Sequence, residues 1–222
     1  MSDIISVGLP VLKSRAGLPA LCLVTGATGY IGGRLVVELL NHGYRVRVLA
    51  RNPERLKNHP WINRVEVAEG DANDEYALTQ AMQGVDVAYY LLHALMSKND
   101  FEDKERNLAH HFVKCAKSAG ISRIVYLGGI IAPHEELSPH MKSRAETGEI
   151  LRASGIPTIE LRAAVVIGSG SASFEMLRYL TERLPIMTVP KWVNVHIQPI
   201  AVRDVLRYLV GAAAVDPKIT GA

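Results

Sequence analysis

Cysteine is scarce in this chain of 222 residues, which carries only Cys22 and Cys115. So few thiols exclude a disulfide-rich secreted scaffold, and because both lie in apolar segments we expect buried, reduced side chains. His110 and His111 are neighbours in a helical segment, where successive side chains point about 100° apart and cannot easily share one ion. With no other ligand cluster at metal spacing, we predict no metal site.

Long apolar runs and a strong charge of one sign are missing too. No segment approaches the roughly 18 apolar residues of a membrane-spanning helix. Residues 1–20 include Asp3 and Pro10, and they lack the basic start and unbroken apolar core of a signal peptide. A formal net charge of +3 provides no basic stripe for nucleic acid. We therefore expect a cytoplasmic protein without membrane or nucleic-acid partners, in which residues 1–20 form a poorly ordered leader or an edge appendage.

The composition is that of a globular domain, with 48% hydrophobic and 21% charged residues. Strand-like and helix-like segments alternate six times from residue 21 onward, and Gly43 is expected to end the first helix. The strand-like segments are 21–24, 44–50, 64–69, 86–92, 123–127 and 158–167, and the helix-like segments are 34–41, 74–83, 101–119, 141–153, 171–184 and 201–213. This alternation predicts a doubly wound parallel α/β sheet, a three-layer Rossmann fold with strand order 3-2-1-4-5-6, over residues 21–222.

The most informative segment, residues 21–33, reads LCLVTGATGYIGG and joins an apolar strand to a helix through three glycines. Gly26 permits the tight turn, Gly29 lets phosphates approach the backbone, and Gly32 lets the helix pack closely on the strand. The first amides of the helix then face an anion. We predict a cradle for a dinucleotide pyrophosphate in preference to a glycine-rich turn without a ligand. The predicted contacts from this segment also include Thr28, Tyr30 and Ile31.

The residue directly after the second strand selects the cofactor in this fold. A carboxylate there binds the ribose of NAD, whereas Arg51 in this chain offers a donor fork suited to the 2′-phosphate of NADP. NADP is therefore favoured over NAD, the alternative being an arginine that is simply solvated. Asp71, after the third strand, either binds the adenine amino group or caps helix 74–83. The other predicted cofactor contacts at the carboxyl edge of the sheet are Ala72, Leu91, Leu92 and His93.

These motifs together resemble the short-chain dehydrogenase/reductase superfamily in its extended or atypical branches. The resemblance rests on TGATGYIG at residues 25–32, on Gly70-Asp71 and on Leu161-Arg162. Further along, YLGGI, SGSASFEMLRYLTERLP and QPIAVRDVLRYL resemble a subgroup of atypical NAD(P)H-binding members that often carry another C-terminal domain. The resemblance implies an NAD(P) cofactor and a homodimer built on helices beside the fourth and fifth strands.

Active members of that superfamily place a Tyr-x-x-x-Lys pair on the helix after the fifth strand, and this chain lacks the tyrosine. One alignment puts His140 at the tyrosine position and Arg144 at the lysine position, while another register uses Ser138 and Lys142. We favour the first alignment. In it, His140 can pass a proton and Arg144 can hold the nicotinamide ribose, although a solvated histidine at a helix start is the commoner case.

The serine that polarises the carbonyl in the superfamily is also missing. Its position corresponds to Gly128, Gly129 or Ile130, and Gly128 remains a predicted cofactor contact. Residues 169–173, SGSAS, either bring amides to a ligand or form a connector in which Ser171 or Ser173 caps the next helix.

Two functions follow from these residues. The first is an NADP-dependent oxidoreductase, or an epimerase- or dehydratase-like enzyme, acting on an unknown small carbonyl compound or alcohol. The alternative is a redox sensor or assembly subunit that binds NADP(H) without catalysis. Residues 218–222 resemble the approach to a further strand, so we expect the substrate-binding portion to be incomplete.

Overall fold

The structure is a computed structural model that describes residues 10–14, 16–92, 101–130, 138–183 and 198–222. Its main sheet has six parallel strands in the order β3-β2-β1-β4-β5-β6. The strands are β1 (Leu21–Thr25), β2 (Arg45–Ala50), β3 (Glu66–Glu69), β4 (Val87–Tyr90), β5 (Arg123–Gly129) and β6 (Thr158–Ala163). This order confirms the predicted doubly wound α/β fold.

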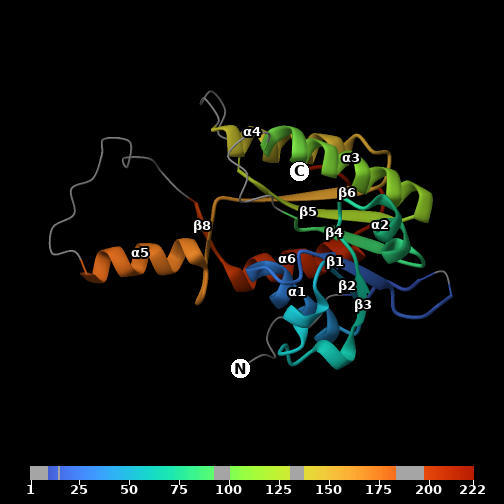
Figure 1. Cartoon of the computed structure of the whole chain (residues 1–222), viewed down its shortest axis with the longest axis horizontal. Helices are drawn as coiled ribbons and strands as arrows, with labels where there is room; N and C mark the ends of the chain where they lie inside the picture. Colours follow the sequence, from blue (N-terminus) through green and yellow to red (C-terminus); the bar gives the residue numbers. More distant parts are fainter. Residues whose placement is uncertain (1–9, 15, 93–100, 131–137, 184–197) are drawn as a thin grey trace.

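Helices cover both faces of the sheet (Figure 1). On one face lie α2 (Glu75–Met82), α3 (Phe101–Ala119) and α4 (Pro139–Arg152), and on the other lie α1 (Tyr30–Asn41) and α6 (Val202–Ala214). Short 3-10 turns at Pro53–Leu56 and Ile62–Arg64 connect β2 to β3. Every residue of β1 and β4 is buried, because a strand covered by helices on both faces must be apolar throughout.

The predicted strand 158–167 is in fact two strands. After β6, β7 (Val165–Ile167) pairs in parallel with β8 (Pro199–Ala201) in a separate two-stranded sheet. Within the described residues β5 ends at Gly129, which pairs with Ala163, and the chain beyond that point pairs with β8 instead. Helix α5 (Ala172–Arg183) follows β7 and extends away from the main sheet (Figure 1).

Helix α1 begins at Tyr30, four residues before the predicted start at Arg34, and Gly29 is its N-cap. Its end agrees with the prediction, since Gly43 follows the C-cap with a positive φ of +89°. Helix α2 is capped by Asp74, whose side chain accepts hydrogen bonds from two backbone amides of the first turn.

The two ends of the described chain lie against the sheet. Lys13 and Pro19 form an antiparallel bridge, and Leu12 packs against the core beside β2. Gly221 forms a parallel bridge with Ile159 at the outer edge of β6. Within the described ranges, no helix combines the length and apolar character needed to cross a membrane.

Candidate functional site: the carboxyl edge of the sheet

The glycine turn leaves β1 between β2 and β4, which is the switch point of a doubly wound sheet. Gly26 has a φ of +74°, and a Cβ there would lie within 3.0 Å of the carbonyl group of Leu91. A Cβ at Gly32 would lie within 3.0 Å of the carbonyl carbon and oxygen of Gly26. Both positions therefore exclude a side chain, one through its backbone conformation and the other through the close approach of α1 to the turn.

Gly29 occupies the open front of the same turn. It has an extended conformation, with φ −82° and ψ 169°, and a Cβ there would meet, among the described residues, one atom within 4 Å, the Gly26 oxygen at 3.2 Å. The first turn of α1, which is fully described, contains no acidic side chain. Its backbone amides and the positive end of the helix dipole are therefore open to an anion. These features fit the pyrophosphate of a dinucleotide.

Thr25, which the sequence analysis did not single out, fixes the geometry of this turn. Its buried Oγ1 donates to the Tyr89 carbonyl oxygen over 2.7 Å and accepts from the Leu91 amide over 3.2 Å. The hydroxyl thus joins the ends of β1 and β4 at the point where both strands leave the sheet. The sequence signal that was available for this position is a hydroxyl residue at the end of an apolar strand.

Arg51 and Asp71 follow β2 and β3 at the adenine side of this edge. The Arg51 side chain is 76% exposed, and its Nη1 lies 3.9 Å from Asp71 Oδ2. Asp71 Oδ1 accepts hydrogen bonds from the backbone and side-chain nitrogens of Asn73, both over 2.9 Å. Asp71 does not cap α2, because Asp74 does so, and that alternative is wrong. Ala72, another predicted contact, is buried beside this loop.

Tyr30 contributes to the turn through its backbone, because its side chain points elsewhere. The Arg34 guanidinium stacks on the Tyr30 ring at 3.9 Å from the ring centre and donates to the Ser169 carbonyl oxygen over 3.0 Å. The Tyr30 hydroxyl is buried, and a Cβ added to Gly168 would lie 2.5 Å from it. The two side chains therefore attach α1 to the segment after β7. Ile31 is half-buried and packs on the core around α1 and α6.

A surface hollow of about 780 Å³ adjoins this contact. Thr28 and Gly29 line one end of it, and the rest follows the outer face of α1 between residues 59–61 and α6. Since nucleotides bind at the carboxyl ends of parallel strands, the hollow lies beside the expected cofactor site and does not coincide with it.

Residues 169–173 use their polar groups within the fold. The Gly170 amide donates to Glu175 Oε1 over 3.0 Å, and the Ser171 hydroxyl donates to the Val166 carbonyl oxygen over 3.1 Å. These contacts fit the connector described above better than a ligand-binding loop.

On the nicotinamide side, α4 brings Arg144 to the end of β5. Arg144 Nη2 donates to the Leu127 carbonyl oxygen over 2.6 Å, and the Tyr126 hydroxyl donates to the Arg144 carbonyl oxygen over 3.1 Å. His140 is exposed in the first turn of α4, and the Ser138 hydroxyl caps that turn by accepting from the Met141 amide. The structure thus gives Ser138, from the alternative register, a capping role.

Tyr126 does not replace the missing tyrosine of the superfamily. Burial raises the pKa of Tyr126 to about 12, although the nearby Arg144 lowers it, so the phenol stays protonated at neutral pH. Its hydroxyl is committed to the Arg144 backbone. Burial likewise raises the pKa of Tyr90 and of Tyr89. These three phenols therefore do not supply the acid/base group of the superfamily's missing tyrosine.

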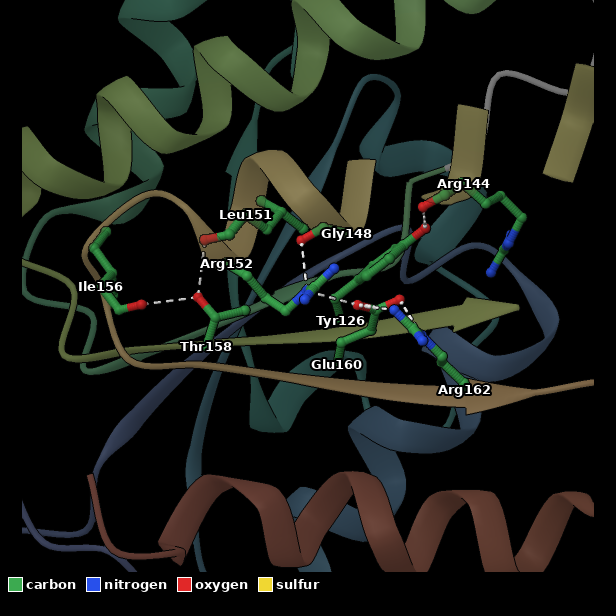
Figure 2. A network of polar contacts seen from close by, with 9 residues as sticks. All are labelled: Tyr126, Arg144, Gly148, Leu151, Arg152, Ile156, Thr158, Glu160 and Arg162. Carbon is green, nitrogen blue, oxygen red and sulfur yellow. Dashed lines mark hydrogen bonds and ion pairs between the residues drawn. The ribbon is translucent and has the colours of Figure 1, made fainter. Parts of the chain in front are cut away.

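A buried ionic network joins β6 to α4 (Figure 2). The Glu160 side chain is 1% exposed and pairs with Arg152 Nε at 3.0 Å and with Arg162 Nε at 2.9 Å. A Cβ on either Gly128 or Gly148 would lie 2.7 Å from a carboxylate oxygen of Glu160. Gly128 therefore has a packing reason to lack a side chain. The sequence analysis missed Glu160, and two opposite charges two residues apart in one strand, Glu160 and Arg162, were the available signal.

The last predicted cofactor contacts follow β4. Leu91 is buried and Leu92 half-buried just beyond β4, whereas His93 lies outside the described residues. Over the described ranges, no three His, Cys, Asp or Glu side chains meet at a point where they could hold a metal ion. Cys22 and Cys115 are both buried free thiols.

Comparison with known proteins adds to this geometry. A sequence profile of an NAD(P)H-binding family matches residues 26–167. The ceramide reductase of Caulobacter vibrioides is 28% identical over 170 residues, which cover 75% of this chain and 52% of that protein. A putative dihydroflavonol 4-reductase of Synechocystis is 36% identical over 116 residues, which cover 49% of this chain and 32% of that protein. The chain thus spans about half the first relative and about a third of the second.

Solved structures show the same relationship. The triphenylmethane reductase of Citrobacter in complex with NADP(H) is 28% identical, with a TM-score of 0.58 over 73% of this chain and 55% of that one. The Bordetella bronchiseptica enzyme WbmH in complex with NAD+ has a TM-score of 0.69 at 20% identity, over 88% of this chain and 73% of that one. At 20% identity the second likeness shows the fold alone.

Proposed function

This chain belongs to the NAD(P)H-binding family, and from that premise we propose that it is an NADP(H)-dependent oxidoreductase acting on a small carbonyl compound or the corresponding alcohol. The glycine turn supports dinucleotide binding through Gly26, Gly29 and Gly32. The reductases among its relatives support the reaction type, and the Citrobacter reductase supports NADP(H) as the form of the cofactor.

The position of Arg51 carries the preference for NADP(H). Its guanidinium is mostly exposed directly after β2, and the ion pair with Asp71 is long. Such a pair between exposed groups contributes little, so a 2′-phosphate competes for the guanidinium at small cost. A phosphate also accepts two hydrogen bonds from the fork, which a ribose hydroxyl cannot do.

The chemistry at the other end of the cofactor involves α4 and β5. When bound, NADPH would provide the hydride for reduction of the carbonyl carbon. Arg144, anchored on the Leu127 carbonyl oxygen, would orient the nicotinamide ribose, and His140 would give a proton to the carbonyl oxygen. The same two groups would serve an epimerase or dehydratase that oxidises its substrate transiently.

Two further properties remain proposals. A cytoplasmic location is supported by the two buried free cysteines, which need no oxidising compartment. A homodimer is what the resemblance to short-chain dehydrogenases implies.

Calorimetric titration of the full chain with NADPH and NADH tests the cofactor preference. We expect wild type to bind NADPH more tightly than NADH. Arg51→Ala should lower the affinity for NADPH by about tenfold and leave the affinity for NADH unchanged. Arg55→Ala is the matched control, since Arg55 is exposed in the next turn of the same connection. Failure to bind either nucleotide, or an equal loss for both nucleotides in Arg51→Ala, would contradict the proposal.

A second experiment tests the reaction. NADPH consumption is followed at 340 nm against a panel of aldehydes, ketones and keto acids, in wild type and His140→Asn. We expect turnover in wild type and a loss of about a hundredfold in the variant. Tight NADPH binding with no consumption across the panel would favour the non-catalytic alternative.

A further inference from the structure

The Glu160 carboxylate fixes two guanidinium groups that serve different ends of β6 (Figure 2). Arg152 is the last residue of α4 and lines a small hollow near Thr158, where β6 begins. Arg162 lies near the other end, and its Cα pairs in register with Gly128 at the end of β5. Of the two arginines, Arg162 therefore stands at the carboxyl edge, where the cofactor and substrate are proposed to meet.

Stability alone is a weak explanation for this network. Removing a carboxylate from water costs several kcal/mol, and replacing a buried ion pair by apolar residues is often neutral or stabilising. Here the arrangement also requires two glycines, Gly128 and Gly148, because either Cβ would meet the carboxylate. What it does provide is a guanidinium group held in one orientation.

The Arg162 guanidinium retains donor capacity beyond Glu160. Its Nε and Nη2 donate to the two carboxylate oxygens at 2.9 and 3.2 Å, so Nη1 is the nitrogen that Glu160 does not engage. The side chain is 33% exposed, so solvent reaches part of it. The hydrogen bond that Arg162 donates to Glu160 also raises the pKa of Arg162, so its positive charge is permanent.

Two guanidinium groups lie at this end of β5. Arg144 is anchored on the Leu127 carbonyl oxygen, and Arg162 stands opposite Gly128, the next residue of β5. Arg152 lies toward the other end of β6, and the carboxylates of Glu160 and Glu149 both act on Arg162. The Arg162 guanidinium offers the N–H donor at Nη1 to an anionic ligand group at this edge.

We propose that Arg162 is a substrate-binding residue that holds an oxyanion, a carboxylate or phosphate group, carried by the carbonyl substrate. The planar guanidinium fork matches both groups, and Glu160 positions it in advance, which lowers the entropy cost of binding. This inference rests on the proposed oxidoreductase function, since it places the oxyanion on the substrate side of the nicotinamide site. It narrows the substrate class to keto acids and phosphorylated carbonyl compounds.

The test compares two arginines that share one partner. The full chain, saturated with NADP+, is titrated calorimetrically with oxalate and separately with inorganic phosphate, at an ionic strength held constant with NaCl. The variants are Arg162→Gln and Arg152→Gln, whose side chains have the same 33% exposure and the same carboxylate partner. Urea unfolding of both variants checks that the fold is intact, and Arg162→Lys keeps the charge while removing the fork.

We expect one of the two anions to bind to wild type and Arg152→Gln, and to bind at least about tenfold more weakly to Arg162→Gln and Arg162→Lys. The anion that binds distinguishes a carboxylate from a phosphate substrate. Equal losses in Arg162→Gln and Arg152→Gln would reduce both arginines to counterions of Glu160 and overturn the proposal. Binding of neither anion to wild type, or competition between the anion and NADP+, would overturn it as well.

Failure of the proposed function gives a different result. If NADP+ does not bind, the oxidoreductase assignment fails at the first step of the experiment. The anion titrations are then run on the cofactor-free chain, where loss of binding in Arg162→Gln alone still identifies an oxyanion site at this residue.

Discussion

The two halves of the sheet differ in how their charged side chains are held. Around β1, β2 and β3, the turn is shaped by backbone contacts at Gly26 and Gly32, and the charged groups Arg51 and Asp71 stay in solvent. Around β5 and β6, the carboxylate of Glu160 is buried and held by side chains from two elements. In the first half, closely packed backbone shapes the turn and the charged side chains are exposed. In the second half, a buried ion-pair network holds the charged side chains in place.

This difference predicts how each half responds to mutation. In the first half, the side chain proposed to set cofactor specificity, Arg51, is exposed and contributes little to stability, so the two properties can change independently. In the second half, Arg162, the residue proposed to bind substrate, pairs with the buried carboxylate of Glu160. Substrate binding and folding stability are therefore linked there. The following substitutions test that contrast.

The largest effect is expected for Gly32→Ala. Its Cβ would lie within 3.0 Å of the carbonyl group of Gly26, and neither backbone segment can move without displacing α1 from the sheet. We expect a loss of more than about 3 kcal/mol in the free energy of unfolding, measured with urea, together with loss of NADPH binding. Gly43→Ala is the control: Gly43 has a φ of +89° but no described atom within 4 Å of the added Cβ, so about 1 kcal/mol of backbone strain is expected. Similar losses in the two variants would argue against close packing as the cause.

Gly148→Ala should lower the free energy of unfolding by a smaller amount, although a change from glycine to alanine within a helix usually raises it. Alanine within a helix normally stabilises it by about 1 kcal/mol relative to glycine. In α4, however, the new Cβ would lie 2.7 to 2.8 Å from three atoms of the Glu160 carboxyl group, so we expect a net loss of about 1–2 kcal/mol by urea unfolding.

A double-mutant cycle identifies the source of that loss. In a Glu160→Ala background the carboxylate is gone, and Gly148→Ala should regain its usual stabilising effect. If Gly148→Ala destabilises both backgrounds equally, the cause lies elsewhere in α4, and the buried carboxylate is not what requires a glycine.

The sequence predicted the half of the site that depends on local spacing. An apolar strand, three glycines at fixed intervals and a helical repeat are sufficient to indicate the turn, because all of its contacts except those of Leu91 and Tyr89 lie within a few residues. The start of α1 was placed too late because Gly32 and Gly33 are poor helix formers in isolation. Close packing on Gly26 decides that they are helical.

The second half escaped prediction because its contacts join distant segments. The predicted strand 158–167 has no local signal at Ala164, where the pairing changes from β5 to β8. The Glu160 carboxylate pairs with Arg152 of α4 and Arg162 of β6, and it lies between Gly128 and Gly148, which have no local sequence signal of that role. Such pairings follow from tertiary structure, which a single sequence does not specify.

The smallest effect is expected for Asp71→Asn, which contrasts directly with the buried carboxylate. The Arg51–Asp71 pair spans 3.9 Å between exposed side chains, and an asparagine oxygen can still accept the hydrogen bond from the Asn73 amide. We therefore expect the free energy of unfolding to change by less than about 0.5 kcal/mol. With the competing carboxylate removed, Arg51 should bind the 2′-phosphate slightly better, so NADPH affinity rises by about twofold while NADH affinity stays the same. If Asp71→Asn lowered the free energy of unfolding as much as Gly148→Ala, the stability of the first half would also depend on its charged side chains. The contrast between the two halves would then be lost.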